Sequence, residues 1–447
     1  MNIQGKGATE IAASIRGLVD SGTLRAGDVL PPMRQLADEL GVNRNTVAAA
    51  YRHLVSSGIA RTRGRAGTVV ADPFGIAEQE GFTPDSALID VGSGNPCPRL
   101  LPNPYAVAPP ADHTPGLYGQ PQIAPALAAL ARTRLFPDQP PATAPTLTNE
   151  TALTLTNGAV DGVERLLAGS LIGGDAVALE DPCFLASINT VRQAGYRPVP
   201  VPVDDQGMTA DGLAAALKAG ARAVVCTPRA HNPTGASLSP ERARSLRELL
   251  ADHPDVLVIE DDHFSVLSAV RHHSIIPAGH PRWALVRSVS KFLGPDLRLA
   301  FIASDPATSA RLHTRLGPGL TWVSHLLQHT VHQLLAAPDG ETTIAAARAH
   351  YQERNAALAR ALRAQGLAAR AADGLNLWVD VGADAGAVSA QLMRRGWLAR
   401  TGDVFALSPG VGRSHLRLTP SDLDDEQIER LAGAVAGSVA AVLRAGR

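Results

Sequence analysis

The chain has 447 residues, 45% of them hydrophobic and 19% charged, and a formal net charge of −1 at pH 7. This length and composition predict a folded protein of about three globular units and exclude a disordered or collagen-like chain. Three cysteines without a CxxC pair support neither a disulfide framework nor a zinc site. Because the sequence has no signal-peptide run and no apolar stretch of about 18 residues, we expect a cytoplasmic protein. From the cysteine pattern we expect no metal site.

Positive charge is concentrated in the first 73 residues, which carry nine lysine and arginine side chains against six acidic ones. Apolar residues at helical spacing predict three short helices, and an alternating stretch with two glycines predicts a two-stranded wing. The helices are expected over residues 8–20, 34–40 and 44–57, and the wing over residues 59–70. Asn43 is the expected N-cap of the third helix. The pattern predicts a winged helix-turn-helix domain over residues 1–71.

In a helix-turn-helix, the second helix enters the major groove and presents polar and basic residues near its start. The side chains predicted to face DNA are Arg34, Asn43, Arg44, Asn45 and Thr46, with Arg63 and Arg65 of the wing reaching phosphates or the minor groove. The predicted core residues are Leu36, Leu40, Val47, Tyr51 and Leu54. The alternative is a solvated helical hairpin with scattered arginines. We expect double-stranded DNA to be a partner.

The same segment resembles the GntR family of winged-helix transcription regulators. The family pattern LP-x-x-R-x-LA-x-x-L-G-V-x-R-x-T-V is met by Leu30, Pro31, Arg34, Leu36, Ala37, Leu40, Gly41, Val42, Arg44, Thr46 and Val47. One departure is Ala48, where some members carry arginine, and this leaves the base preference open.

Residues 72–88 have the composition of a linker. Beyond them, short apolar segments alternate with helical ones, which predicts a mostly parallel sheet covered by helices. The strand candidates are residues 176–179, 197–201, 223–227, 256–260, 284–288 and 300–303. A long helix around residues 341–365 leads to a smaller α+β part. We therefore expect a large domain over residues 89–330 and a small one over residues 331–447.

Lys291 follows a strand candidate in the string Ser288-Val-Ser290-Lys291, and Arg298 comes shortly after it. A lysine after a strand is usually a surface residue. Here the flanking hydroxyls and the guanidinium are groups that a phosphate binds, so the string favours a lysine that forms an imine with pyridoxal 5′-phosphate (PLP).

Other residues supply the remaining groups that PLP needs. Asp261 stands in the acidic run Glu260-Asp261-Asp262 at the end of a strand candidate and would keep the pyridine nitrogen protonated. A capping turn or a divalent-metal cluster also fits this run. Asn232, in Asn-Pro-Thr-Gly, would meet the phenolic oxygen. Phe184 would stack on the ring, although an isolated phenylalanine is more often core. Three residues at a predicted strand-to-helix junction would offer N–H groups to the phosphate, namely Gly158, Ala159 and Val160.

Together these residues resemble a fold-type I aminotransferase, and their combination with the winged helix resembles the MocR subfamily of GntR regulators over essentially the whole chain. The resemblance implies that Lys291 forms the imine and that Asp261 pairs with the pyridine nitrogen. It implies the following further roles: Asn232 at the phenolic oxygen, Ser288, Ser290, Arg298 and the Gly158–Val160 turn at the phosphate, Tyr118 reaching the partner subunit's phosphate, Arg417 on a substrate carboxylate, and Gly94–Pro96 on the substrate side.

One residue departs from the family pattern. His263 stands where the family usually has tyrosine, two residues after the key aspartate. Histidine donates from a shorter reach and titrates near neutrality, so we expect altered imine protonation. Within MocR, the strings ATEIAASIR and VNRNTVAAAYR resemble the PtsJ-type branch, which is linked to vitamin B6 salvage.

Three functions fit this pattern. The first is a homodimeric transcription regulator that senses PLP or an amino compound and binds paired DNA half-sites. The second is a PLP-dependent aminotransferase with a DNA tether, because Lys291, Asp261 and Arg417 leave a transamination half-reaction open. The third is a PLP-storage or scaffold protein, which does not explain Arg34, Arg44 or the wing. The sequence favours the regulator.

Overall fold

The computed structural model describes residues 3–25, 27–57, 59–62, 67–70, 88–107, 117–136, 152–317 and 321–445. The chain divides into two compact units, one of residues 1–79 with 189–197 and one of residues 80–188 with 198–447. None of the helices in these described ranges is long and apolar enough to cross a membrane.

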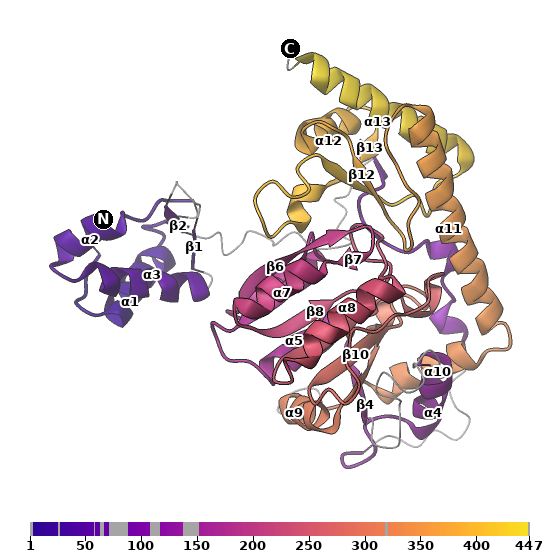
Figure 1. Cartoon of the computed structure of the whole chain (residues 1–447), viewed down its shortest axis with the longest axis horizontal. Helices are drawn as coiled ribbons and strands as arrows, with labels where there is room; N and C mark the ends of the chain where they lie inside the picture. Colours follow the sequence, from indigo (N-terminus) through magenta and orange to yellow (C-terminus); the bar gives the residue numbers. More distant parts are fainter. Residues whose placement is uncertain are drawn as a thin grey trace. The chain divides into compact units, whose positions relative to one another are not determined.

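The first unit is a winged helix-turn-helix (Figure 1). Its elements are α1 (Ala8–Asp20), α2 (Met33–Leu40), α3 (Arg44–Ser56), β1 (Ala60–Thr62) and β2 (Thr68–Val70). Gly41, at φ +62°, ends α2 in the left-handed conformation, and the Asn43 side chain caps α3 by accepting a hydrogen bond from the Asn45 N–H. The predicted helices, cap and wing are confirmed.

The apolar faces of the three helices form the core of this unit. Four of the predicted core residues are buried, namely Leu36, Val47, Tyr51 and Leu54. The fifth, Leu40, is partly buried against the same core. The strands β1 and β2 pair antiparallel, with Ala60 opposite Val70. Arg63 and Arg65, predicted in the wing, lie outside the described residues.

The second unit contains an eight-stranded sheet in the order β4-β11-β10-β9-β8-β5-β6-β7. The strands are β4 (Ala152–Thr156), β5 (Ala176–Asp181), β6 (Arg197–Asp204), β7 (Gly207–Met208), β8 (Ala221–Cys226), β9 (Leu257–Asp261), β10 (Trp283–Ser288) and β11 (Ala300–Ser304). All six strand candidates are therefore strands. The central strands β5, β8, β9 and β10 are parallel to one another. On one side, β11 pairs antiparallel with β10 and with the edge strand β4.

Helices cover this sheet. They are α4 (Pro125–Arg134), α5 (Ala159–Ala168), α6 (Leu185–Gln193), α7 (Ala210–Lys218), α8 (Pro240–Ala251), α9 (Pro306–Leu316) and α10 (His325–Ala336). The short 3₁₀ turns are η2 (Pro98–Leu100), η3 (Pro104–Ala106), η4 (Ser265–Leu267), η5 (Pro295–Leu297) and η6 (Gly402–Phe405). Helices α7 and α8 lie side by side over β5 and β8 (Figure 1). Because both faces are covered, β9, β10 and β11 are buried along their whole length.

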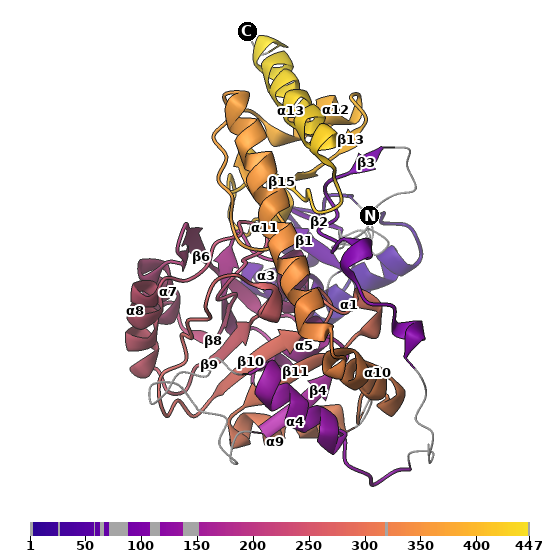
Figure 2. The same cartoon turned by 90° about the vertical axis from the view of Figure 1, so that its right-hand side faces the viewer.

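A long helix, α11 (Gly340–Ala364), runs from α10 to a smaller α+β part (Figure 2). That part contains α12 (Ala385–Met393), α13 (Asp425–Ala445), β13 (Trp397–Leu398) and a sheet of β12 (Leu377–Asp380), β15 (His415–Leu418) and β14 (Arg400–Thr401). It has its own hydrophobic core. The strand β3 (Ile89–Asp90) pairs parallel with β13, so the beginning of the predicted large domain packs with the C-terminal part.

Candidate cofactor site and DNA-contacting helix

Lys291 lies three residues beyond the end of β10, in the turn that leads to η5. The side chain is half-buried, and its Nζ donates a hydrogen bond of 2.9 Å to the carbonyl oxygen of Gly94. The Ser288 hydroxyl donates to the Ser290 hydroxyl at 3.0 Å. The parallel strand order thus brings the lysine and both predicted hydroxyls to the carboxyl ends of the central strands, where α/β sheets bind ligands.

Asp261 ends β9, the strand next to β10, and is opposite Val286. Its side chain is buried, and its Oδ1 has no hydrogen-bond partner among the residues that the structure describes. Burial, with a contribution from Asp262, raises the pKa of Asp261 to about 7. A buried carboxylate oxygen without a partner is costly, and a protonated ring nitrogen would satisfy it.

Two aromatic rings lie parallel beside this carboxylate's strand. The Phe184 ring, just after β5, and the His263 ring, just after β9, are inclined by only 11°, with centroids 6.5 Å apart. The two rings therefore lie face to face where β5 and β9 end.

Gly158 and Arg298 lie together at the start of α5. Gly158 has φ +92°, and a Cβ there would lie 3.1 Å from Nη2 of Arg298. Arg298 itself donates to the carbonyl oxygen of Asn157 at 3.1 Å. Because the first N–H groups of a helix have no intrahelical acceptor, those of Ala159 and Val160 are available to an anion beside this guanidinium.

Arg417 is fully buried on β15. Its Nη1 donates to Oδ1 of Asn232 at 3.1 Å, its Nη2 donates to the carbonyl oxygen of Gly92 at 2.5 Å, and its guanidinium lies over the Phe405 ring. The structure therefore brings Arg417 and Asn232, two of the predicted site residues, into direct contact.

Residues 91–97, called the strap below, connect these parts. Three carbonyl oxygens of the strap accept hydrogen bonds. The carbonyl oxygen of Val91 accepts from the Thr419 N–H, that of Gly92 from Arg417, and that of Gly94 from Lys291. Two of the three cations that the sequence analysis assigned to ligand binding, Lys291 and Arg417, thus donate to this one segment. Gly94–Pro96, predicted on the substrate side, belongs to it.

Tyr118 is 91% exposed, and its ring contacts Trp322 edge to face at a centroid distance of 5.5 Å. The structure of one chain therefore leaves this tyrosine on the surface of its unit. That position is the one expected of a residue that reaches a second subunit.

In the first unit, the predicted DNA-facing residues gather at the start of α2 and α3. Arg34, Asn43, Arg44 and Asn45 are exposed, and Thr46 is half-buried. Neither Arg34 nor Arg44 forms an ion pair with another described residue of the chain. Exposed cations such as Arg34 in α2 and Arg44 at the start of α3, the second helix of the helix-turn-helix, are suited to phosphates and base edges.

Two models of protein families match the chain. Residues 8–70 match bacterial regulatory proteins of the gntR family, and residues 88–435 match aminotransferase class I and II. The chain is 47% identical, over 96% of its length and 98% of the relative's, to the vitamin B6 salvage pathway transcriptional repressor PtsJ of Salmonella typhimurium. The chain belongs to the MocR subfamily of GntR-family transcription regulators.

Further similarities agree with this assignment. The HTH-type transcriptional regulator TauR of Rhodobacter capsulatus is 30% identical, with 93% of both chains covered. An archaeal alanine:glyoxylate aminotransferase has the same fold, with a TM-score of 0.71 over 80% of this chain and 92% of its own, at 21% identity. The predicted fold class, a winged helix joined to an aminotransferase fold of type I, is confirmed, as is the resemblance to PtsJ.

The sequence analysis missed several buried charged residues of this MocR regulator. Glu180 accepts from the Thr227 N–H at 3.0 Å and lies 3.4 Å from Nε2 of His231, and burial raises its pKa to about 8. Burial, with a smaller effect of His263, lowers the pKa of His231 to about 3, so this imidazole is neutral. The available signal for Glu180 was an acidic residue near the end of a strand that begins with four apolar residues.

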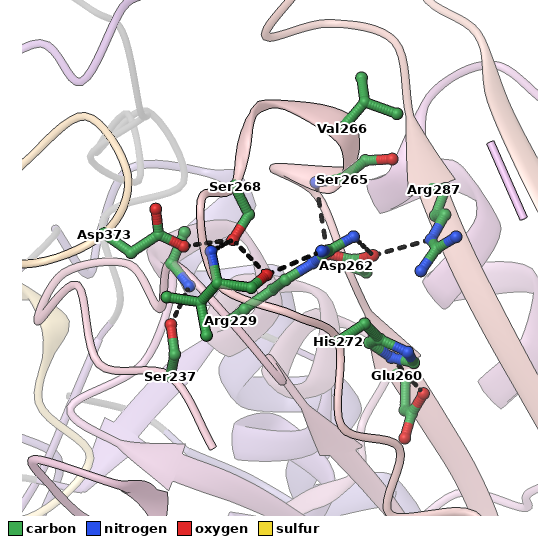
Figure 3. A network of polar contacts seen from close by, with 12 residues as sticks. Arg229, Ser237, Glu260, Asp262, Ser265, Val266, Ser268, His272, Arg287 and Asp373 are labelled. Atoms are coloured by element: carbon green, nitrogen blue, oxygen red, sulfur yellow. Dashed lines mark hydrogen bonds and ion pairs between the residues drawn. The ribbon is translucent and has the colours of Figure 1, made fainter. Parts of the chain in front are cut away.

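Asp262 was predicted only as part of an acidic run. It accepts two hydrogen bonds from Arg229, at 2.8 and 2.9 Å, and one from Arg287 at 2.7 Å (Figure 3). Burial alone would raise the pKa of Asp262, but the two guanidinium groups hold it well below its usual range. Asp261 and Asp262 therefore lie in different surroundings, because Asp262 is paired with two arginines and Asp261 Oδ1 has no described partner. The described residues form no metal-binding group of three or more His, Cys, Asp or Glu side chains.

Proposed function

We propose that this regulator binds PLP at Lys291 and changes its affinity for DNA when that site is filled. PLP supplies an aldehyde and an electron-withdrawing ring for chemistry on amines. The Lys291 amine would attach the cofactor, and Asp261 would accept from its ring nitrogen. The phosphate would be held by Arg298, Ser288, Ser290 and the first N–H groups of α5. Asn232 would meet the phenolic oxygen, and Phe184 would stack on one face of the ring.

The observation that carries this proposal is the pair of hydrogen bonds from Lys291 and Arg417 to the strap. A lysine ammonium has three N–H donors, and covalent attachment at Nζ leaves it with fewer. Filling the cofactor site therefore weakens the hold of Lys291 on Gly94. The strap follows β3, which begins two residues after the segment 71–87 that leads back to the winged helix. A change in the strap is thus passed to the chain that carries the DNA-contacting helix.

The relative PtsJ is named as a repressor of vitamin B6 salvage. We extend that role to this chain: it would repress genes of vitamin B6 metabolism, with PLP as the effector. Exposed Tyr118 and the subfamily's architecture support a homodimer that binds two DNA half-sites, because two-fold symmetric proteins read symmetric operators.

The test combines a visible spectrum with a DNA-binding assay. An operator selected from a random duplex pool would be titrated with the wild type and with Lys291→Ala, with and without PLP. We expect a PLP-dependent visible band and a change in operator affinity of about 5- to 150-fold in the wild type, and neither in the variant. An equal PLP effect on the operator affinity of both proteins would overturn the proposal.

A second candidate function, transamination, is favoured by the position of Arg417 beside Asn232. Its test adds a panel of amino acids to the PLP-loaded protein. The half-reaction would be established if one amino acid bleaches the visible band of the wild type and the same amino acid leaves the band of Arg417→Gln unchanged. A band that survives the whole panel would leave the chain a regulator alone.

A further inference from the structure

The second unit contains a cavity that lies apart from the residues proposed to hold PLP. Its volume is about 830 Å³, within the usual range of small-molecule sites. Its walls come from the end of α4, the η4 loop, the end of α10 and the beginning of α11. The described residues that line it include none of the proposed cofactor ligands.

This cavity is strongly cationic. The described lining contains five arginines and one acidic residue, Glu341; the arginines are Arg134, Arg229, Arg271, Arg287 and Arg348. Behind the wall, Asp262 pairs with both Arg229 and Arg287, so one carboxylate balances two guanidinium groups (Figure 3). Glu341, exposed at the rim, pairs with Arg134 at 2.8 Å. Positive charge therefore exceeds negative charge in the lining.

Two donors in the wall lack partners. Ser265 is 1% exposed, and its Oγ has no hydrogen-bond partner among the described residues. In Figure 3 its hydroxyl is directed to the side on which Arg287 lies. Arg348 donates through Nη2 to the carbonyl oxygen of Val266 at 2.6 Å, while its buried Nε has no described partner. Buried donors of this kind are costly unless an acceptor is present.

Ser265 also has φ +47°, a conformation that is unfavourable for a residue with a Cβ. Its N–H lies 3.3 Å from Oδ1 of Asp262, which fixes the turn directly beneath the arginines. The acidic residue Asp373 accepts hydrogen bonds from the Ser268 hydroxyl and from the Ala269 N–H, two residues of the cavity wall. The turn thus presents a hydroxyl to the cavity from a backbone position that costs free energy to maintain.

The rest of the wall is apolar. Leu135, Leu335, Ile344, Val266 and Val270 line the cavity together with the arginines. We propose that the cavity binds a small organic anion, with its phosphate or carboxylate group on the arginines and Ser265 and its apolar body on these side chains. This site is separate from the PLP site and does not depend on the proposed regulation. The two sites approach each other along the chain at Asp261, assigned to the PLP site, and Asp262, which pairs with two arginines of the cavity.

The first experiment is a calorimetric titration of the full-length, PLP-treated protein with inorganic phosphate. We expect Arg348→Gln to weaken phosphate binding at least about tenfold, because a charge-assisted donor is lost. Arg360→Gln, the same change on an exposed residue of the same helix, should leave the dissociation constant unchanged. Thermal unfolding of both variants would establish that they are folded.

Arg298→Gln separates the two phosphate sites. If the cavity is the binding site, phosphate binding survives Arg298→Gln and is lost in Arg348→Gln. Loss in Arg298→Gln with retention in Arg348→Gln would place the anion in the proposed cofactor site and overturn the proposal. Ser265→Ala removes the hydroxyl and should weaken the binding of phosphate several-fold. This result would distinguish binding in the cavity from a diffuse attraction of phosphate to the arginines.

The nature of the ligand is tested with phenyl phosphate and benzoate. Binding of phenyl phosphate more tightly than inorganic phosphate supports an apolar body and a phosphate ester, and binding of benzoate more tightly than phenyl phosphate supports a carboxylic acid. Equal affinity for inorganic and phenyl phosphate, or binding of none of the three, would overturn the proposed ligand class.

Discussion

Lys291 and Gly94 are 197 positions apart in the chain, and a hydrogen bond of 2.9 Å joins the Nζ of the first to the carbonyl oxygen of the second. Arg417 makes the corresponding contact with Gly92, across 325 positions. Lys291 and Arg417, which we propose to contact a cofactor and a carboxylate, are therefore both hydrogen-bonded to the strap.

The strap should loosen when the cofactor site is filled. We expect PLP to increase amide hydrogen exchange over residues 92–96, because Lys291 then donates less to Gly94. Lys291→Met lacks the ammonium, so its strap should exchange fast with and without PLP. Mass spectrometry of exchanged peptides measures this, and an unchanged strap in the wild type would contradict the mechanism.

Asp261→Asn should stabilise the cofactor-free protein while removing PLP binding. Because the folded-state pKa of Asp261 is about 7 against an ordinary 3.8, the unfolded chain ionises first as pH rises. Asp261 therefore lowers the stability of the wild type between about pH 4 and pH 7, and the loss is complete above pH 7. Glu180 acts in the same direction in both proteins.

The difference between the two proteins should be absent near pH 4 and reach about 4 kcal/mol or less at pH 8. Thermal unfolding across this pH range measures it. A variant less stable than the wild type at pH 8 would show that Asp261 has a partner in the folded, cofactor-free protein.

Gly158→Ala should damage the proposed phosphate site. The new methyl group would lie 3.1 Å from the Arg298 guanidinium, and alanine disfavours φ +92°. We expect PLP affinity to fall by about tenfold or more, as measured by titration of the visible band. Gly173→Ala is the matched control, because a Cβ at Gly173 meets no atom within 4 Å.

Arg44→Ala should abolish specific operator binding and leave the PLP spectrum intact, because Arg44 is exposed at the start of α3 in the other unit. Arg16→Ala, an exposed arginine of α1, should have little effect on specificity. Fluorescence anisotropy at two salt concentrations separates loss of base contacts from loss of phosphate contacts. Undiminished operator binding by Arg44→Ala would mean that another element reads the bases.

Asp262→Asn should strongly destabilise the second unit. It would leave Arg229 and Arg287 buried without their shared carboxylate, at a cost of about 3–5 kcal/mol. Glu341→Gln removes only the exposed rim partner of Arg134 and should cost about 1 kcal/mol or less. Denaturant unfolding of the two variants tests this contrast, and similar small losses would mean that water reaches the buried arginines.

The sequence alone determined the elements and the chemistry of this protein. Hydrophobic spacing predicted the three helices and wing of the first unit, and alternation predicted every central strand, because these periods depend on local backbone geometry. Strings such as Ser288–Lys291 and Asn232–Gly235 contain their residues within a few positions, so Lys291 and Asn232 were accessible as candidates.

Only the tertiary structure decided which of these residues meet. The order of the strands places Asp261 next to β10, and the pairing of β3 with β13 brings the strap to Arg417 and Lys291. The role of Asp262 was hidden for the same reason: its partners, Arg229 and Arg287, lie 33 and 25 positions away, on other segments. Contacts at such separations depend on how the sheet is assembled, which no local pattern specifies.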